Sequence, residues 1–379
     1  MTHAVVPSEN LRTVGPASAD GLEGVVAAHT LLSDVDGELG RLVLGGHDVE
    51  RLALGHGYED ALALFLDGAL PDEARRASLR RGLGRARARA FDVGAASDAV
   101  RRAPDAMSAL RVALSSITFE ARSHEEEVLA IAGATAVALA AHGRARLQLA
   151  PIAPEVERSH AHDLLAMLEP DAPLLDARAG ALDSYLVTVS DHGLNASTFT
   201  ARIVASTGAS LVASVVAAIG ALEGPLHGGA PGPVLDMLDA IGSPENAEAW
   251  LDAELAAGRR IMGMGHRIYR VRDPRAAVLE KAIERLCHEG LASTRLALAR
   301  AVEQAARAAL RERYPARTLD TNVEFYTAVL LDAVGLSRTC FTATFALGRV
   351  IGWCAHVREQ RSVGRLVRPR SIYVGPAAA

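Results

Sequence analysis

Long segments rich in Ala, Leu and Arg, separated by Pro and Gly, dominate this chain. Within these segments apolar residues recur three and four positions apart, which is the periodicity of an amphipathic helix. Aromatic residues make up only 4% of the sequence, a balance that favours helices over sheets. We therefore predict an all-α protein. Helices between residues 49 and 144 are expected to break at Pro71, Gly82, Gly94 and Pro104.

Length and charge limit the possible classes of function. With 379 residues, 50% of them hydrophobic and 22% charged, the chain is globular and has room for two or three domains. A net charge of −5 provides no general attraction for nucleic acid or anionic lipid, so any anion must be bound by local arginines. The densest charge run, Arg75 to Arg89, contains no interleaved aromatic residue. We interpret it as a solvated helix face and expect no nucleic-acid partner.

One short β element is expected near the N-terminus. Apolar and polar residues alternate between Gly21 and Gly46, on both sides of Asp36-Gly37. An Asp-Gly pair between two such runs is a strong hairpin signal. The sequence therefore predicts a small β-hairpin beside the helices.

Cysteine usage and hydropathy indicate a cytoplasmic protein. The three cysteines, Cys287, Cys340 and Cys354, show no CxxC or His/Cys spacing, so neither a disulfide framework nor a metal site is expected. Met1 to Asp20 lacks the basic region and apolar core of a secretory signal. Ile203 to Leu222 carries no charge for 20 residues, but it is rich in small residues. We expect a helix packed inside a bundle or dimer there, not a membrane span.

A change of composition follows Leu222. Residues 223–233 contain four glycines and three prolines, and the segments beyond them are shorter and more charged. This pattern predicts a hinge and the start of a smaller domain. Within that domain, Ser243-Pro244 and Asp273-Pro274 each predict a helix N-cap followed by Pro at the first helical position.

Three histidines lie in Gly- or Asn-rich settings. His192 belongs to Asp-His-Gly-Leu-Asn, His227 to Gly-Pro-Leu-His-Gly-Gly, and His266 to Gly-Met-Gly-His-Arg. Glycines allow a ligand to approach the backbone closely and leave the imidazole outside a regular helix. Each histidine alone is more typical of a loop or of a satisfied polar residue. Together they indicate acid–base chemistry.

Three charged residues have both a structural and a functional interpretation. Arg275 lies in the first turn of a helix, where the dipole disfavours a cation unless an anion is nearby. Arg349 lies in an apolar run, so its guanidinium needs either an internal salt bridge or an anionic ligand. Thr321-Asn322-Val323-Glu324 has the sequence of a capping box, in which Glu324 bonds back to the Thr321 amide. The alternative is a catalytic carboxylate in a cleft beside His227.

Taken together, these motifs resemble the citrate synthase family, specifically its shorter bacterial type. The likeness runs in order through most of the chain, at residues 21–26, 191–207, 224–238, 261–279, 322–326, 345–360 and 368–375. It implies an all-α homodimer with shared active sites, in which a large helical domain and a smaller, mobile helical domain close over the substrates. The large domain would comprise residues 1–223 and 329–379, and the small domain residues 224–328.

The resemblance also implies an activity: an acyltransferase of the tricarboxylic acid cycle that condenses acetyl-CoA with oxaloacetate and hydrolyses the citryl thioester. No cofactor is implied, because the CoA thioester is a substrate. His227 would donate to the thioester carbonyl, Glu324 would remove a methyl proton, and His266 would polarise the ketone. Oxaloacetate would be bound by His192, Arg275, Arg349 and Arg368, the last from the partner subunit. CoA would contact Gly263, Met264 and Gly265, with Arg270 or Arg272 facing its phosphates.

This chain departs from the family pattern at Glu324, where most members have Asp, although some bacterial members also carry Glu. The additional methylene displaces the carboxylate. Leu44-Gly45-Gly46 and Asp105-Ala106-Met107 also differ from the usual motifs. Two alternatives remain open: a 2-methylcitrate synthase that uses propionyl-CoA, since one methylene shifts selectivity only modestly, and a non-catalytic paralogue that binds the same ligands.

Overall fold

The computed structural model describes residues 22, 25–116, 123–228 and 231–376. All of its helices and strands lie in one unit, Leu32–Ala379, and Met1–Leu31 form a separate unit. The segment Met1 to Asp20 lies outside the described residues.

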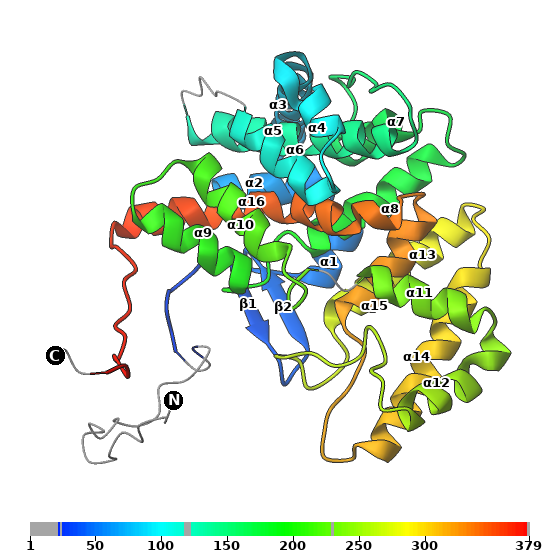
Figure 1. Ribbon diagram of the computed structural model, residues 1–379. Coiled ribbons are helices and arrows are strands. Elements are labelled where there is room, and N and C mark those ends of the chain that lie inside the picture. The colour runs from blue at the N-terminus through cyan, green and yellow to red at the C-terminus, as the bar shows by residue number, and fades with distance from the viewer. Residues whose placement is uncertain (1–21, 23–24, 117–122, 229–230, 377–379) are drawn as a thin grey trace, which may run out of the picture. The chain divides into compact units, whose positions relative to one another are not determined.

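Helices make up most of the described chain, which confirms the predicted all-α class (Figure 1). The first eight are α1 Val49–Gly55, α2 Tyr58–Asp67, α3 Glu73–Ala90, α4 Asp98–Arg101, α5 Ala106–Ser116, α6 His124–Arg146, α7 His160–Leu168 and α8 Leu175–Thr188. The others are α9 Ala196–Ser206, α10 Leu211–Leu222, α11 Pro231–Ile241, α12 Ala247–Ala256, α13 Pro274–His288, α14 Thr294–Arg313, α15 Val323–Ala333 and α16 Phe341–Val363. Short π or 3₁₀ segments occupy Phe91–Ala95, Pro244–Asn246 and Arg338–Cys340.

The predicted hairpin is present and is extended by a third short strand. Strand β1 (Ser33–Asp36) pairs antiparallel with β2 (Arg41–Leu44), and β2 pairs with β3 (His47–Asp48). Asp36 closes the loop between β1 and β2, because its carboxylate accepts hydrogen bonds from the amides of Glu38 and Leu39 at 3.1 and 2.9 Å.

Two expectations for α3 are wrong. The helix runs through Gly82 without a break, because packing against α6 outweighs the low helix propensity of glycine. The arginine run is also not entirely solvated. Arg87 is fully buried and its Nε donates to Asp163 at 2.6 Å, so this guanidinium belongs to an internal ion pair.

The uncharged run Ile203 to Leu222 forms parts of two helices, not one. Gly208 adopts a left-handed φ of 84° after α9, and the Ser210 hydroxyl caps α10 by accepting from the Ala213 amide at 3.1 Å. The two helices pack against each other. Helix α6 and the segment Arg338–Val363 are long and apolar enough to cross a membrane, but 83% and 94% of their apolar windows are buried inside the protein. Such burial is typical of core helices.

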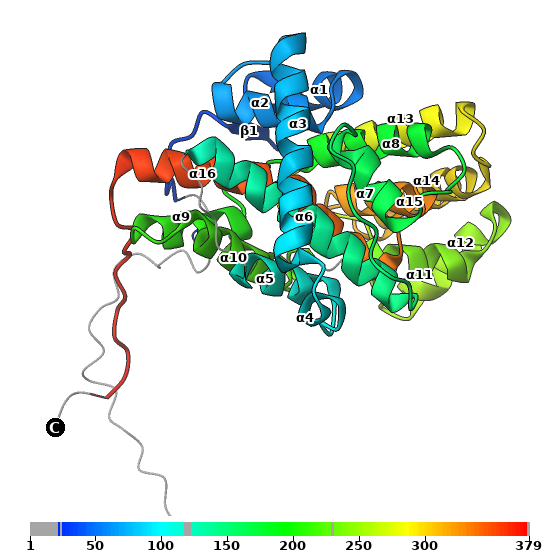
Figure 2. The same ribbon diagram turned by 90° about the horizontal axis from the view of Figure 1, so that it is seen from above.

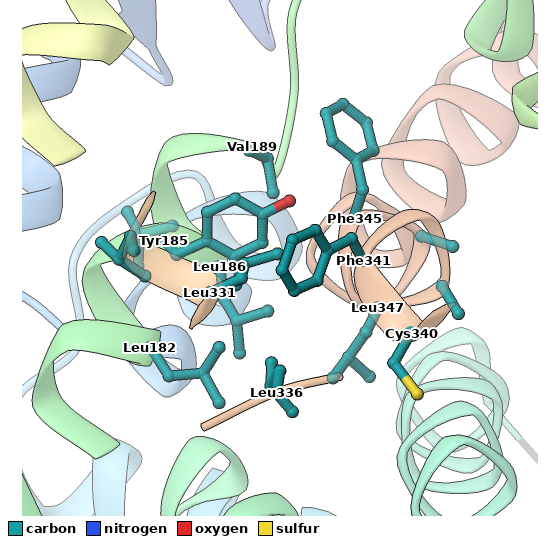
Figure 3. Close-up of a cluster of buried hydrophobic side chains, with 14 of the residues drawn as sticks. Leu182, Tyr185, Leu186, Val189, Leu331, Leu336, Cys340, Phe341, Phe345 and Leu347 are labelled. Carbon is teal, nitrogen blue, oxygen red and sulfur yellow. The ribbon is translucent and has the colours of Figure 1, made fainter. Parts of the chain in front are cut away.

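Helix α16 organises the packing. It contacts α2, α5, α6, α8, α9 and α10 (Figures 1 and 2). Helix α8 contacts α16 on one side and α13 and α15 on another. Figure 3 shows the apolar cluster at this junction, with Leu182, Tyr185 and Leu186 of α8 facing Leu331 of α15 and Phe341 of α16. Helix α8 therefore connects the α16 layer to the helices that follow residue 231.

The predicted N-caps of the later helices are present at Ser243 and Asp273, each followed by Pro. The proposed end of the small domain, residue 328, falls inside α15. The division into a large and a small domain stays a prediction.

Helix α16 approaches the end of α8 closely because two glycines face it. A Cβ at Gly348 would lie 2.6 Å from a Val189 side-chain carbon, and one at Gly352 would lie 2.1 Å from the Ser190 carbonyl oxygen. The second contact is with backbone, which cannot move independently of the helix end. These glycines therefore set the position of Arg349, which lies between them.

Gly352→Ala should destabilise the protein by roughly 3 kcal/mol, because the added methyl overlaps the Ser190 carbonyl. Gly180→Ala in α8 is the matched control, since a Cβ there meets nothing within 4 Å and alanine favours the helix by about 0.5–1 kcal/mol. Urea unfolding of both variants measures the difference. Equal stabilities would contradict the close approach.

Candidate active site

His192 and His266 lie beside each other with Tyr269 and Arg275. Their imidazole centroids are 5.7 Å apart, and His192 Nε2 lies 3.1 Å from the Tyr269 hydroxyl. His266 Nδ1 accepts hydrogen bonds from the amides of Ile268 and Tyr269 at 3.0 and 3.1 Å. This assigns the His266 proton to Nε2, which lies 3.4 Å from an Arg275 terminal nitrogen. Two donors therefore point at the same place, as expected around an acceptor on a ligand.

Both imidazoles are held neutral. Burial, followed by the charge of Arg275, lowers the pKa of His266 to about 4. Burial, together with Arg275 and Arg349, also lowers the pKa of His192 well below its usual range. Neutral imidazoles offer one N–H donor each without adding charge to the site.

The buried carboxylate of Asp273 supplies the anion that the position of Arg275 requires. It accepts from the Arg275 Nε at 3.0 Å and from a terminal nitrogen at 2.7 Å. It also accepts from the Arg275 amide, so it caps α13, and from the Val323 amide at the start of α15. A guanidinium in the first turn of a helix is thus balanced by its own N-cap.

Arg349 is buried and has no carboxylate within 4.0 Å among the described residues, so the internal salt bridge that the sequence left open is absent. Its Nε donates to the Val189 carbonyl, its Cζ lies 4.7 Å from the Phe345 ring centroid, and one terminal nitrogen has no hydrogen-bond partner. Burial lowers the pKa of Arg349 to about 10, so it remains charged at neutral pH. An anionic ligand would satisfy this group.

The capping-box interpretation of Glu324 is wrong. The N-cap of α15 is Asn322, which accepts from the Glu324 amide at 3.0 Å, and the Thr321 amide donates to Asp320 instead. Within the described part of the chain, Glu324 Oε2 is buried without a hydrogen-bond partner. Burial raises the pKa of Glu324 to about 7, although Arg275 opposes the shift. A carboxylate with this pKa is suited to act as a general base near neutral pH.

His227 lies in the turn after α10 and is oriented by Ser197. Its Nε2 accepts from the Ser197 amide at 3.3 Å and lies 2.9 Å from the Ser197 hydroxyl, which also receives the Trp353 indole N–H at 3.2 Å. This assigns the proton to Nδ1. Burial, with a smaller effect of Arg349, lowers the pKa of His227 to about 4. The imidazole is therefore a neutral N–H donor.

The residues expected at CoA fall into two groups. Gly263 and Gly265 have left-handed φ values of 75° and 85°, and their segment pairs with the strand-like residues before α15. Arg270 is exposed. Arg272 is occupied, because its guanidinium donates to Glu303 and Glu280 at 2.7 Å and stacks on Tyr326. Two internal carboxylates thus neutralise the charge of Arg272, and the expectation that Arg270 or Arg272 faces the CoA phosphates stays a prediction.

Within one chain, Arg368 lies apart from the other expected site residues. It is exposed in the segment after α16, which Figures 1 and 2 show running away from the helices around α13 and α15. Within one chain, the described structure therefore unites His192, His227, His266, Arg275, Arg349 and Glu324, which perturb one another's pKa values, but leaves out Arg368.

Several polar neighbours were not predicted. Tyr269, Ser197 and Asp273 contact site residues directly, and Asp191, next to His192 in the chain, accepts from His356 Nε2 at 3.3 Å. Asp191 lies inside the His192 motif and Ser197 two residues after it, so their proximity in sequence was an available signal. No local pattern distinguishes Tyr269, because only the fold turns its hydroxyl toward His192.

The arrangement has a definite chemical capacity. Two guanidiniums and two neutral imidazoles can bind a small polyanion and polarise a carbonyl oxygen. Glu324 and His227 can supply a base and a donor of hydrogen bonds.

Comparisons with known proteins agree with the geometry. The family model described as citrate synthase, C-terminal domain, matches residues 21–370. A citrate synthase of Acidithiobacillus ferridurans is 34% identical over 378 residues, covering 95% of this chain and 96% of that protein. The putative citrate synthase 2 of Mycobacterium tuberculosis is 46% identical over 208 residues, and the matched region spans 55% of this chain and about half, 53%, of that relative.

Solved structures show the same fold over the whole chain. The citrate synthase of Pyrobaculum aerophilum superposes with a TM-score of 0.85 at 30% identity, covering 100% of this chain and 98% of that one. The citrate synthase of Thermoplasma acidophilum, solved as a ternary complex with carboxymethyl coenzyme A and oxaloacetate, gives a TM-score of 0.83 at 26% identity, covering 96% and 97%. With a family match over nearly its full length, and with its histidines, arginines and glutamate brought together by the same fold, this chain belongs to the citrate synthase family.

Proposed function

We propose that the protein condenses acetyl-CoA with oxaloacetate and hydrolyses the citryl thioester to citrate and CoA. The observation that carries this proposal is the unpaired Glu324 carboxylate, with a pKa of about 7, beside two buried guanidiniums and three neutral histidines. A base poised near neutral pH next to a cationic pocket suits carbon deprotonation followed by attack on an anionic ketone. The Thermoplasma acidophilum relative was solved with oxaloacetate and a CoA analogue, which supports the same ligands here.

Oxaloacetate would occupy the space in front of Arg275, Arg349 and His192. The two guanidiniums are fixed by Asp273 and by the Val189 carbonyl, so little reorganisation is needed to bind carboxylates. His266 Nε2–H, beside Arg275, would donate to the ketone oxygen and stabilise the negative charge that develops there.

Glu324 and His227 would act together on the thioester. Ionised Glu324 removes a proton from the acetyl methyl group, while the Nδ1–H of neutral His227 donates to the thioester carbonyl and stabilises the enol. The enol carbon then attacks the polarised ketone, and water hydrolyses the resulting thioester. Glutamate in place of the usual aspartate extends the base by one methylene, and the half-buried position of Glu324 at the start of α15 is compatible with this role.

For CoA we propose contacts with the backbone of Gly263, Met264 and Gly265 and with the exposed Arg270. We further propose a cytoplasmic homodimer in which residues 224–328 close over the substrates. The exposed segment after α16 would deliver Arg368 to the oxaloacetate site of the partner subunit. Its course away from the site of its own chain supports this arrangement.

Purified protein should release CoA from acetyl-CoA only when oxaloacetate is present. Propionyl-CoA, assayed in parallel, separates the alternatives: the thioester with the higher kcat/KM names the enzyme a citrate or a 2-methylcitrate synthase. Release with neither thioester, together with measurable oxaloacetate binding, would contradict the proposal and indicate a binding paralogue.

The loss of activity at acid pH should follow the protonation of Glu324. Because the base must be ionised, kcat/KM for the thioester should fall about tenfold per pH unit below a pKa of about 7. Glu324→Gln should abolish turnover. It should also raise the thermal midpoint at pH 8, because a carboxylate whose folded pKa exceeds its unfolded value destabilises the fold once ionised. A limb near pH 4.5, or an active Gln variant, would exclude Glu324 as the base.

His227→Ala should reduce kcat by on the order of a hundredfold or more, the usual effect of removing a positioned acid–base group. Ser197→Ala should reduce kcat by about tenfold, because it removes a hydroxyl that orients His227. Ser214→Ala in α10 is the matched control: among the described residues its buried hydroxyl donates only to the carbonyl of Ser210, the N-cap of that helix. Unchanged kcat in the His227 variant would refute the assigned role.

A further inference from the structure

Tyr185 of α8 carries a buried hydroxyl that the structure leaves unpaired. The side chain is fully buried, and its Oη has no hydrogen-bond partner among the described residues. Burial, and then the charge of Glu324, raises the pKa of Tyr185 well above its usual range, so the phenol stays protonated and is a neutral donor. A buried hydroxyl without a partner costs free energy, which suggests that it is satisfied by a ligand.

The surroundings of Arg349 indicate where this hydroxyl points. The guanidinium of Arg349 lies against the Val189 carbonyl through Nε and over the Phe345 ring. Figure 3 shows the Tyr185 hydroxyl directed toward the region between Val189 and Phe345. Tyr185 and Val189 lie one turn apart on the same face of the chain at the end of α8. The charge of Arg349 also lowers the pKa of Tyr185, so Arg349, which has one terminal nitrogen without a partner in the described chain, is a cationic neighbour of this hydroxyl.

Two other groups near Tyr185 do not satisfy it. The Thr327 hydroxyl on α15 interacts directly with the Tyr185 side chain and lowers its pKa, but the contact does not reach hydrogen-bond geometry and neither hydroxyl has another partner in the described chain. Glu324 lies on the same face of α15, one turn earlier, and is the alternative acceptor. The direction of the phenol in Figure 3, toward Val189 and Phe345, favours the Arg349 side.

We propose that the Tyr185 hydroxyl and the Arg349 guanidinium bind the same carboxylate of oxaloacetate. Tyr185 thereby becomes a further substrate-binding residue, an assignment that rests on the proposed function. A phenol is a suitable second donor here. It strengthens carboxylate binding without adding a third cation, which would lower the pKa of the nearby Glu324 and weaken the base.

Tyr185→Phe removes the hydroxyl and little else. Oxaloacetate alone, titrated into the free enzyme by calorimetry, should bind roughly ten- to a hundredfold more weakly, as expected for losing one hydrogen bond to a charged group. KM for oxaloacetate should rise in parallel, whereas the pKa of the acid limb should not change. The thermal midpoint of the ligand-free variant should equal or exceed that of the wild type, because an unpaired buried hydroxyl is removed.

Tyr58→Phe is the matched control. Its buried hydroxyl donates to the Leu347 carbonyl at 3.2 Å, so its removal should lower the thermal midpoint and leave oxaloacetate affinity unchanged. Unchanged oxaloacetate affinity in Tyr185→Phe would overturn the assignment. A changed pKa of the acid limb with an unchanged oxaloacetate affinity would also overturn it. That result would indicate that the Tyr185 hydroxyl donates to Glu324 instead. If wild-type protein bound no oxaloacetate, the proposed function itself would fail, and this result is distinct from a defect confined to the variant.

Discussion

The buried carboxylate of Asp273 holds the site together. It pairs with the Arg275 guanidinium through two bonds, caps α13, and accepts the Val323 amide at the start of α15, the helix that carries Glu324. A charge in such a place is tolerated only when it is fully paired, and here every bond of the carboxylate also fixes a site element. A single side chain thus connects the proposed substrate-binding cation, Arg275, to the helix that carries the proposed base.

Around this carboxylate, burial controls protonation. It lowers the pKa values of His192, His227 and His266, so that these imidazoles are neutral at pH 7. It also raises the pKa of Glu324 to about 7. The arginines oppose the shift of Glu324, so its pKa settles near 7 instead of higher. Neutral donors and a weak base placed beside fixed cations are what enolisation of a thioester next to a dianion requires.

The packing of the helices brings α16 close to the end of α8. Gly348 and Gly352 allow α16 to contact the end of α8, so that the Val189 carbonyl and the Phe345 ring enclose the Arg349 guanidinium. The same junction buries Tyr185 (Figure 3). Two buried polar groups without a partner in the described chain, an Arg349 terminal nitrogen and the Tyr185 hydroxyl, lie at this junction and are available to the proposed ligand.

Local sequence alone determined the helical class, the Asp36-Gly37 hairpin and the Asp273 N-cap, since each depends on neighbours within a few residues. The resemblance named the histidines, arginines and Glu324, but local pattern favoured a capping box for Glu324. Tertiary structure decided otherwise, because Asp320 and Asn322 take the amides at the start of α15 and leave the carboxylate free. The burial of Arg87 and the internal pairing of Arg272 likewise depended on partners distant in sequence, whereas the break between α9 and α10 rests on the local residues Gly208 and Ser210. Periodicity records which face of a segment is apolar, whereas only packing decides which charge each buried group meets.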